Sequence, residues 1–130
     1  MFRRIAPVIG LALGLAASAA HAQTPPVPDP IQGTPSKDFS NVSPSNLAGI
    51  MNYCTEHEYV SYEVGNPILY GLSEKYKTTE PNETGNYDYA LGTAGQFARN
   101  GSTFIITAYT SIDDRKEACA NAVKASQPYL

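Results

Sequence analysis

The chain has 130 residues, with nine Lys and Arg against 12 Asp and Glu, and a net charge of −3 at pH 7. This length suits one small domain, and the acidic balance argues against nucleic acid or an anionic membrane surface as a partner. Two cysteines and two histidines occur in the whole chain, which leaves few residues for a metal site or a nucleophilic catalytic device.

The first 22 residues are predicted to be an export signal. Arg3 and Arg4 precede an almost unbroken apolar stretch over residues 5–20, and Ala20-His21-Ala22 supplies the small residues that a signal peptidase accepts. The stretch is shorter than the roughly 20 residues of a bilayer span, so we expect cleavage rather than a membrane anchor. The mature chain keeps seven bases and 12 acids, because the signal contains two of the bases. We expect it in the periplasm or outside the cell, without a membrane span.

Residues 23–42 are predicted to form a disordered tether. Such a segment buries too little surface to offset the conformational entropy that is lost when it becomes ordered. A proline-rich ligand for a partner's groove is the alternative, and a plain spacer is favoured. The folded domain is then expected over residues 43–130, a size at which a core is thin and a disulfide matters. The prolines of the tether are Pro25, Pro26, Pro28, Pro30 and Pro35.

Four helices are expected in the folded part, and the first two begin near prolines. The first spans about residues 45–58, after Ser43 or Ser45 as its cap and with Pro44 in the first turn. The second spans about residues 66–77, where Asn66 is the cap and Pro67 the first residue. The apolar stripe of the first helix follows i, i+3, i+4, i+7 spacing and consists of Leu47, Ile50, Met51 and Cys54.

The third and fourth helices are predicted over residues 85–99 and 111–125. Asn100-Gly101 would end the third, because these residues adopt the left-handed conformation found at helix ends. Gly92 and Gly95 weaken that helix, and small residues there would let another backbone approach closely. Ser111 to Asp114 resembles a capping box at the start of the fourth helix.

One run, Thr103 to Thr107, is rich in β-branched residues and resembles a strand. No second strand is predicted to pair with it. We therefore expect an extended buried connector, or an edge at Phe104-Ile105-Ile106 that pairs with another chain, rather than a sheet. The fold class that results is mainly α, with about four helices behind a proline-rich tether.

Cys54 and Cys119 each lie on the apolar side of a predicted helix in an exported chain. A disulfide between them would close a loop of 65 residues and contribute roughly 4 kcal/mol in the chain-entropy model. Two buried free thiols are the alternative. Metal ligation and redox chemistry are disfavoured, since two thiolates lack the companions of a closed zinc site and there is no C-x-x-C motif.

No residue pattern indicates a catalytic or metal site, and no cofactor is predicted. The mature chain keeps one histidine, His57, which lies between Glu56 and Glu58 on a polar stretch. A solvated surface histidine is the favoured interpretation and a pH-sensing role the alternative. The sequence therefore predicts that this chain is not an enzyme.

Nine tyrosines are unusual for a chain of this size. Tyr76 and Tyr87 fall in the predicted core stripes of their helices. Tyr59, Tyr62 and Tyr89 fall off the stripes and form a candidate binding surface, because tyrosine combines apolar area with a hydroxyl. Packing in the core and at its boundary is the alternative explanation for the tyrosines.

Asn46-Leu47-Ala48-Gly49-Ile50-Met51-Asn52-Tyr53-Cys54, followed by Tyr59, resembles the YjjA-type family of small exported bacterial proteins, a family of unknown function. In that family an N-A-A-G-aliphatic run leads into Y-C, and a C-terminal helix carries a second cysteine. Cys119 to Ala125 stands in the place of the second motif. The resemblance implies export, a helical fold and paired cysteines, and it implies no catalytic residues.

Two classes of function fit these expectations. The first is a non-enzymatic periplasmic or secreted protein that binds another periplasmic protein or is related to envelope stress, with an acid-stress chaperone as its sharpest form. The second is a partner-specific inhibitor, such as an immunity protein against a toxin of the envelope. A hydrolase that uses His57 is a minor third alternative.

Overall fold

A computed structural model describes residues 33–80 and 85–130, and the statements below refer to these residues. The predicted export signal and residues 23–32 of the predicted tether lie outside them. The elements in chain order are α2 (Pro44–Glu56), α3 (Tyr62–Tyr76), α4 (Gly85–Thr93), β1 (Gln96–Arg99), β2 (Ser102–Ile105), η2 (Ile106–Ala108), α5 (Ile112–Ser126) and η3 (Gln127–Tyr129). The expected mainly α fold with four helices is confirmed. None of the described helices is long and apolar enough to cross a membrane.

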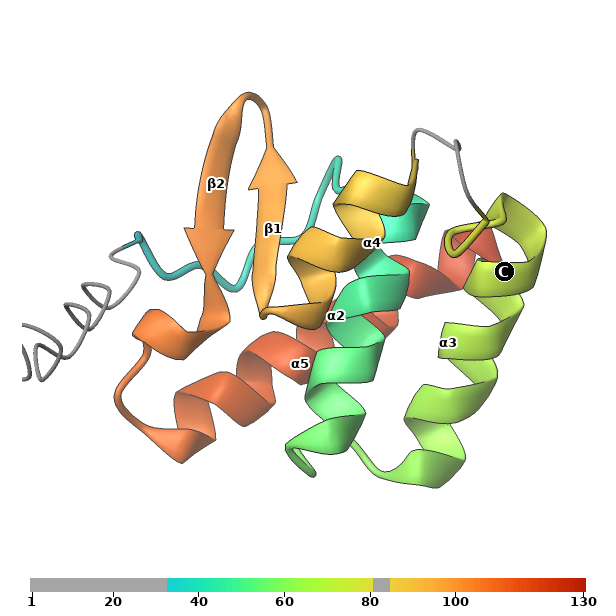
Figure 1. Ribbon diagram of the computed structural model, residues 1–130. Helices are drawn as coiled ribbons and strands as arrows, with labels where there is room; N and C mark the ends of the chain where they lie inside the picture. Colours follow the sequence, from blue (N-terminus) through green and yellow to red (C-terminus); the bar gives the residue numbers. More distant parts are fainter. Residues whose placement is uncertain (1–32, 81–84) are drawn as a thin grey trace, which may run out of the picture. The chain divides into compact units, whose positions relative to one another are not determined.

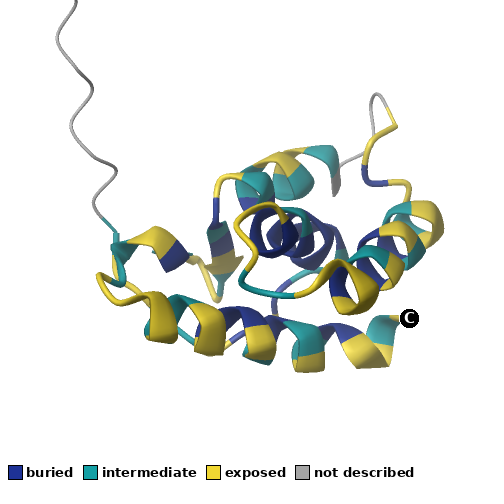
Figure 2. Ribbon diagram, turned by 90° about the horizontal axis from the view of Figure 1, so that it is seen from below, coloured by how far each residue is buried: buried dark blue, intermediate teal, exposed yellow. Residues whose placement is uncertain are grey.

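Helix α2 lies at the centre of the domain and packs against α3, α4 and α5 (Figure 1). Ser43 is its N-cap, and the Ser43 hydroxyl accepts a hydrogen bond from the Asn46 backbone N–H at 3.2 Å. Almost every residue of α2 is buried, so the helix is dark blue along most of its length in Figure 2. An apolar stripe on a single side was too narrow a prediction, since a helix covered on several sides is buried all round.

Helix α5 begins as predicted. The Ser111 hydroxyl accepts a hydrogen bond from the Asp114 backbone N–H at 3.1 Å, and Asp113 and Asp114 lie in the first turn. Their negative charge is favourable next to the positive end of the helix dipole. The buried side of α5 packs onto α2, and its opposite side is exposed (Figure 2).

Helix α3 begins four residues before the predicted start. Ser61 is the N-cap, and Pro67 lies inside the helix instead of opening it. Proline at this position removes one backbone hydrogen bond to the preceding turn. The buried side chains of Ile68, Leu69 and Leu72 hold the helix against α2 and outweigh that loss. The predicted cap at Asn66 is therefore wrong.

The third predicted helix is half helix and half strand. Helix α4 ends at Thr93, and Gly95 has a positive φ of 78° that no helix contains. Residues 96–99 form β1, which pairs with β2 in antiparallel register, so that Phe97 lies opposite Phe104. Asn100 and Gly101 have φ values of 51° and 82°, as in the two-residue turn of a hairpin. The expectation of a strand without a partner in its own chain is wrong.

The segment from Gly33 to Val42, which the sequence assigns to the tether, packs onto the domain. Phe39 and Val42 are 4% and 1% exposed and belong to the core. The Phe39 ring stacks on Phe97 with centroids 4.3 Å apart. The Thr34 carbonyl accepts a hydrogen bond from the Ile105 N–H at 3.1 Å, on the edge of β2. The predicted tether therefore extends too far by these residues.

Asn46 connects α2 to α4 and β1 through a buried amide. Its Nδ2 donates to the backbone carbonyls of Asp88 at 3.1 Å and Gln96 at 3.0 Å, and its Oδ1 accepts from the Ala98 N–H at 2.9 Å. The backbones come this close because Gly92 faces α2: a Cβ on Gly92 would lie 2.6 Å from the Ile50 nitrogen. The close approach expected at the small residues of this segment is confirmed at Gly92.

Lys37 connects the N-terminal segment to α5. Its Nζ donates to Asp114 Oδ1 at 2.7 Å and to Glu117 Oε2 at 2.6 Å, and lies 5.3 Å from the centre of the Tyr109 ring. The Lys37 carbonyl accepts a hydrogen bond from the Asn121 amide at 3.1 Å. The two carboxylates raise the pKa of Lys37, and the hydrogen bond from Lys37 lowers the pKa of Asp114 below 3.8.

We expect Asn46→Ala to lower the free energy of unfolding by about 2–4 kcal/mol, since it removes a buried amide and leaves three part-buried backbone groups, at residues 88, 96 and 98, without partners. Urea titration followed by circular dichroism measures the change. Asn52→Ala is the matched control, because Asn52 lies on the same helix and is only partly buried; its effect should stay within about 0.5 kcal/mol. Equal effects of the two substitutions would contradict the role given to Asn46.

The domain should become less stable in acid as Asp114 loses its charge. This follows because the pKa of Asp114 is lower in the folded state than in the unfolded state. Its contribution is complete above the ordinary pKa of 3.8 and disappears as the pH falls through the lower folded value. Lys37 adds nothing in this range, since it is protonated in both states. Urea midpoints measured from pH 6 down to pH 2.5 should therefore fall less in Lys37→Met than in the wild type. The lowered pKa of Asp38, which depends chiefly on hydrogen bonds from Ser40, should persist in both proteins.

Candidate functional site

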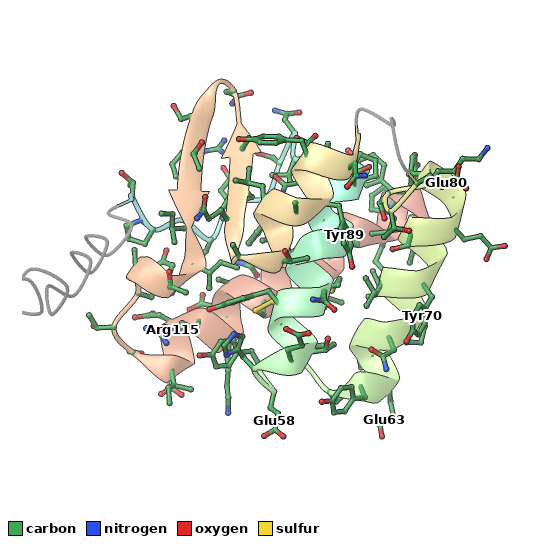
Figure 3. The ribbon with its side chains drawn as sticks, viewed as in Figure 1. Glu58, Glu63, Tyr70, Glu80, Tyr89 and Arg115 are labelled. Carbon is green, nitrogen blue, oxygen red and sulfur yellow. A yellow bond between two sulfur atoms is a disulfide. The ribbon has the colours of Figure 1, made fainter. Side chains whose placement is uncertain are left out.

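Cys54 and Cys119 form the predicted disulfide. Their Cα atoms are 5.8 Å apart, and the bond links the last turns of α2 to the middle of α5 across 65 residues of chain. Both side chains are fully buried, and the bond between the sulfur atoms appears in yellow in Figure 3. Neither sulfur is a free thiolate, so the pair serves as a covalent link between two helices rather than as a nucleophile or a metal ligand. Among the described residues, no group of three or more His, Cys, Asp or Glu could hold a metal ion.

A cluster of aromatic rings and one arginine lies next to the disulfide. The exposed His57 ring stacks on Tyr59 with centroids 5.6 Å apart and lies 4.4 Å from the ring of Tyr53. The Arg115 guanidinium donates to the Tyr59 hydroxyl at 3.3 Å and to the Tyr109 carbonyl at 2.7 Å. Burial is the main cause that raises the pKa of Tyr53. His57 is thus a surface residue, as predicted, and its ring is held by stacking.

The three tyrosines of the candidate binding surface have different surroundings. Tyr59 packs against the core and Arg115, Tyr62 is 55% exposed at the start of α3, and Tyr89 is half-buried on α4. Their role in binding stays a prediction. The core position predicted for Tyr87 is wrong. This side chain is 73% exposed, because the nine-residue helix α4 packs on α2 through another of its sides.

A second group of side chains surrounds Tyr70, a residue outside the predicted binding surface. Tyr70 is 65% exposed on α3. Burial is the main cause that raises the pKa of Tyr89, and the charges of Glu56 and Tyr70 raise it further, so both groups lie within electrostatic reach of the Tyr89 phenol. Tyr62 and Tyr70 are eight residues apart, which is two i,i+4 steps along one side of a helix. This spacing is the sequence signal that could have pointed to Tyr70.

An open hollow of about 550 Å³ lies beside Tyr70. We call Glu56, Tyr70, Tyr89 and this hollow the Tyr70 face; Figure 3 labels Tyr70 and Tyr89 on it. The face combines phenol rings and carboxylates, which are groups that recognise a cationic or an aromatic partner. The lining of the hollow consists of Tyr70, Ser73, Glu74, Lys77, Thr79 and Glu80.

Removing the disulfide should destabilise the domain by about 4 kcal/mol in the chain-entropy model, because the unfolded chain regains the freedom of a long loop. The double substitution Cys54→Ala, Cys119→Ala tests this by urea titration. Addition of a reductant should lower the midpoint of the wild type and leave that of the double variant unchanged. A wild-type midpoint that does not respond to complete reduction would contradict the stabilising role of the bond.

Comparison with known proteins gives one strong match. No family model matches the chain. The chain is 64% identical over 134 residues to a protein of Gluconobacter oxydans (strain 621H) named "Alcohol dehydrogenase, 15 kDa subunit", and the alignment covers 100% of both sequences.

This match corrects the predicted function. An envelope-stress protein of unknown role and a partner-specific inhibitor are both wrong, because a relative of this identity and coverage carries the name of a dehydrogenase subunit. The resemblance to the YjjA-type family stays a prediction. The chain belongs to the family of the alcohol dehydrogenase 15 kDa subunit.

Proposed function

We propose that this chain is the small, non-catalytic subunit of an alcohol dehydrogenase complex, in which a larger subunit carries the active site. The match over the full length of a protein named as such a subunit carries the proposal. At 64% identity the two chains share one fold, and full coverage means that the small size is common to both proteins.

The chemistry of the described residues is compatible with a binding role. Oxidation of an alcohol requires an acceptor for the hydride or the electrons and a base for the hydroxyl proton. The two cysteines are joined in a disulfide, and the His57 ring stacks on Tyr53 and Tyr59. These groups stabilise the domain, and the proposal assigns the reaction to the larger subunit.

The proposal places the complex in an oxidising compartment. A buried disulfide persists where no thiol system reduces it, as in the bacterial periplasm. The predicted export signal at residues 1–22 supports the same location, and the partner would be a periplasmic protein. Covalent linkage of α2 to α5 gives the subunit a preformed surface, which lowers the entropy lost on binding.

Deletion of the gene for this chain tests the proposal. We expect the dehydrogenase complex purified from the deletion strain to lack the small subunit and to lose stability, since a bound subunit stabilises its partner by mass action. Thermal inactivation of alcohol dehydrogenase activity measures this loss, and the wild-type gene should restore the heat stability of the activity. Asn52→Ala serves as a control variant that should restore it equally.

Two further measurements separate binding from catalysis. The mature chain alone should oxidise no alcohol, and an affinity-tagged chain purified from its own cells should carry the larger subunit and its activity. A tagged chain that elutes free of any dehydrogenase, from cells in which the dehydrogenase is active, would refute the proposal. Activity in the isolated chain would refute the non-catalytic role.

A further inference from the structure

The carboxyl end of α2 carries negative charge where a helix is better stabilised by positive charge. Glu56 is the last residue of α2, Glu58 follows two residues later with a φ of 60°, and the last turn contains no basic residue. The helix dipole is negative at this end and repels both carboxylates. Within residues 33–80 and 85–130 the bases that form ion pairs are Lys37 and Arg99. Glu56 and Glu58 are not among their partners. The isolated domain therefore leaves this charge without compensation.

Helix α3, which packs beside α2, adds acids and an exposed ring. Glu63 lies in its first turn, and Glu74 lines the hollow beside Tyr70. The nearby Lys75 is turned away, because its Nζ donates to the Tyr129 carbonyl at 3.1 Å. Figure 3 shows Glu58 and Glu63 at the end of the domain where α2 passes into α3, with Tyr70 farther along α3.

The hollow gives this face a concave part. Its rim combines the Tyr70 ring with the Glu74 and Glu80 carboxylates, and Lys77 is the single basic residue of the lining. Residues that dominate binding energy are aromatic or arginine side chains that fill such hollows. A planar guanidinium suits these groups, since it can lie over a phenol ring and donate paired hydrogen bonds to a carboxylate.

We propose that the Tyr70 face, together with Glu58 and Glu63, is the docking surface for an arginine-bearing surface of the larger dehydrogenase subunit. This inference rests on the proposed function. Binding would bring positive charge to the carboxyl end of α2 and remove the repulsion there. The repulsion destabilises this end of α2 in the isolated domain, and its relief would contribute to the free energy of binding.

Other occupants fit the face less well. A purely apolar partner would bury the carboxylates of Glu56 and Glu74 without compensation, which is strongly unfavourable. A second copy in a twofold dimer would bring the same acidic patch against itself. Anionic lipid headgroups and nucleic acid carry the same sign of charge as the face and would be repelled.

Complexes purified from a deletion strain that expresses tagged full-length variants test the inference. Mass photometry on serial dilution of each complex measures its dissociation constant. We expect Tyr70→Ala to raise this constant about tenfold or more and Glu56→Gln to raise it several-fold. If these two variants co-purify with no larger subunit at all, their binding is weakened beyond the measurable range, which supports the inference equally. Raising the ionic strength should weaken the wild-type complex more than the Glu56→Gln complex.

The chain offers matched controls. Tyr87→Ala removes an even more exposed tyrosine from α4, two residues from Tyr89 and thus on another side of the helix. Asp113→Asn removes one negative charge from the first turn of α5, a helix that contributes no residue to the lining of the hollow. Both should change the dissociation constant by less than about twofold. Urea midpoints that are not lowered show that Tyr70→Ala and Glu56→Gln fold normally; for Glu56→Gln the midpoint should rise slightly, since the repulsion by the helix dipole is removed.

Each other outcome overturns a defined claim. If the wild-type chain carries no larger subunit, the proposed function fails and the docking surface fails with it. If the wild-type complex forms and Tyr70→Ala and Glu56→Gln match the controls, the proposed function stands and the docking surface is wrong. A wild-type chain that dimerises, and that Tyr70→Ala converts to a monomer, would assign the face to a second copy instead.

Discussion

Helix α2 has almost no solvent-exposed side, and the placement of the other described elements depends on the need to cover it. Three different interactions hold the cover in place. The Cys54–Cys119 bond attaches α5, and the Asn46 amide attaches α4 and β1 through three backbone groups. The glycine contact between α2 and α4 lets two backbones approach more closely than any side chain would permit. Burial of one helix on all sides thus organises a domain that is too small for a second core layer.

The parts of this fold that follow from local signals could be predicted from the sequence. Ser43 and Ser111 cap their helices because each hydroxyl accepts a hydrogen bond from a backbone N–H three residues later, which is a local interaction. Asn100-Gly101 was ambiguous, since the same left-handed pair ends a helix or turns a hairpin. Tertiary pairing of Phe97 with Phe104 decided for the hairpin. The core positions of Phe39 and Val42 were also missed, because both residues end a polar, proline-rich segment. They are buried only through contacts with a core that the local sequence does not reveal.

The candidate site was less predictable than the fold for a related reason. Helical spacing assigns a side chain to one side of its own helix, and it does not tell which other helices border that side. Tyr59 and Tyr89 both lay off the predicted stripes, yet Tyr59 contacts Arg115 and Tyr89 packs half-buried against the core. Function was least predictable of all, because the residue patterns contain no catalytic motif and a protein-binding surface has no fixed motif of its own. A relative of full length identified the family where residue patterns could not.

The contrast between the two ends of the connected helices bears on how such a subunit works. At the start of α5, Asp113 and Asp114 follow the rule for helix dipoles, and Lys37 compensates Asp114 directly. At the end of α2, Glu56 and Glu58 break the same rule, and no basic residue stands in the last turn. A domain with a thin core has little stability to spare. Local arrangements that oppose folding are therefore expected at functional sites rather than scattered over the surface. The disulfide makes such an arrangement tolerable, since Cys54 anchors α2 two residues before the unfavourable carboxylate of Glu56.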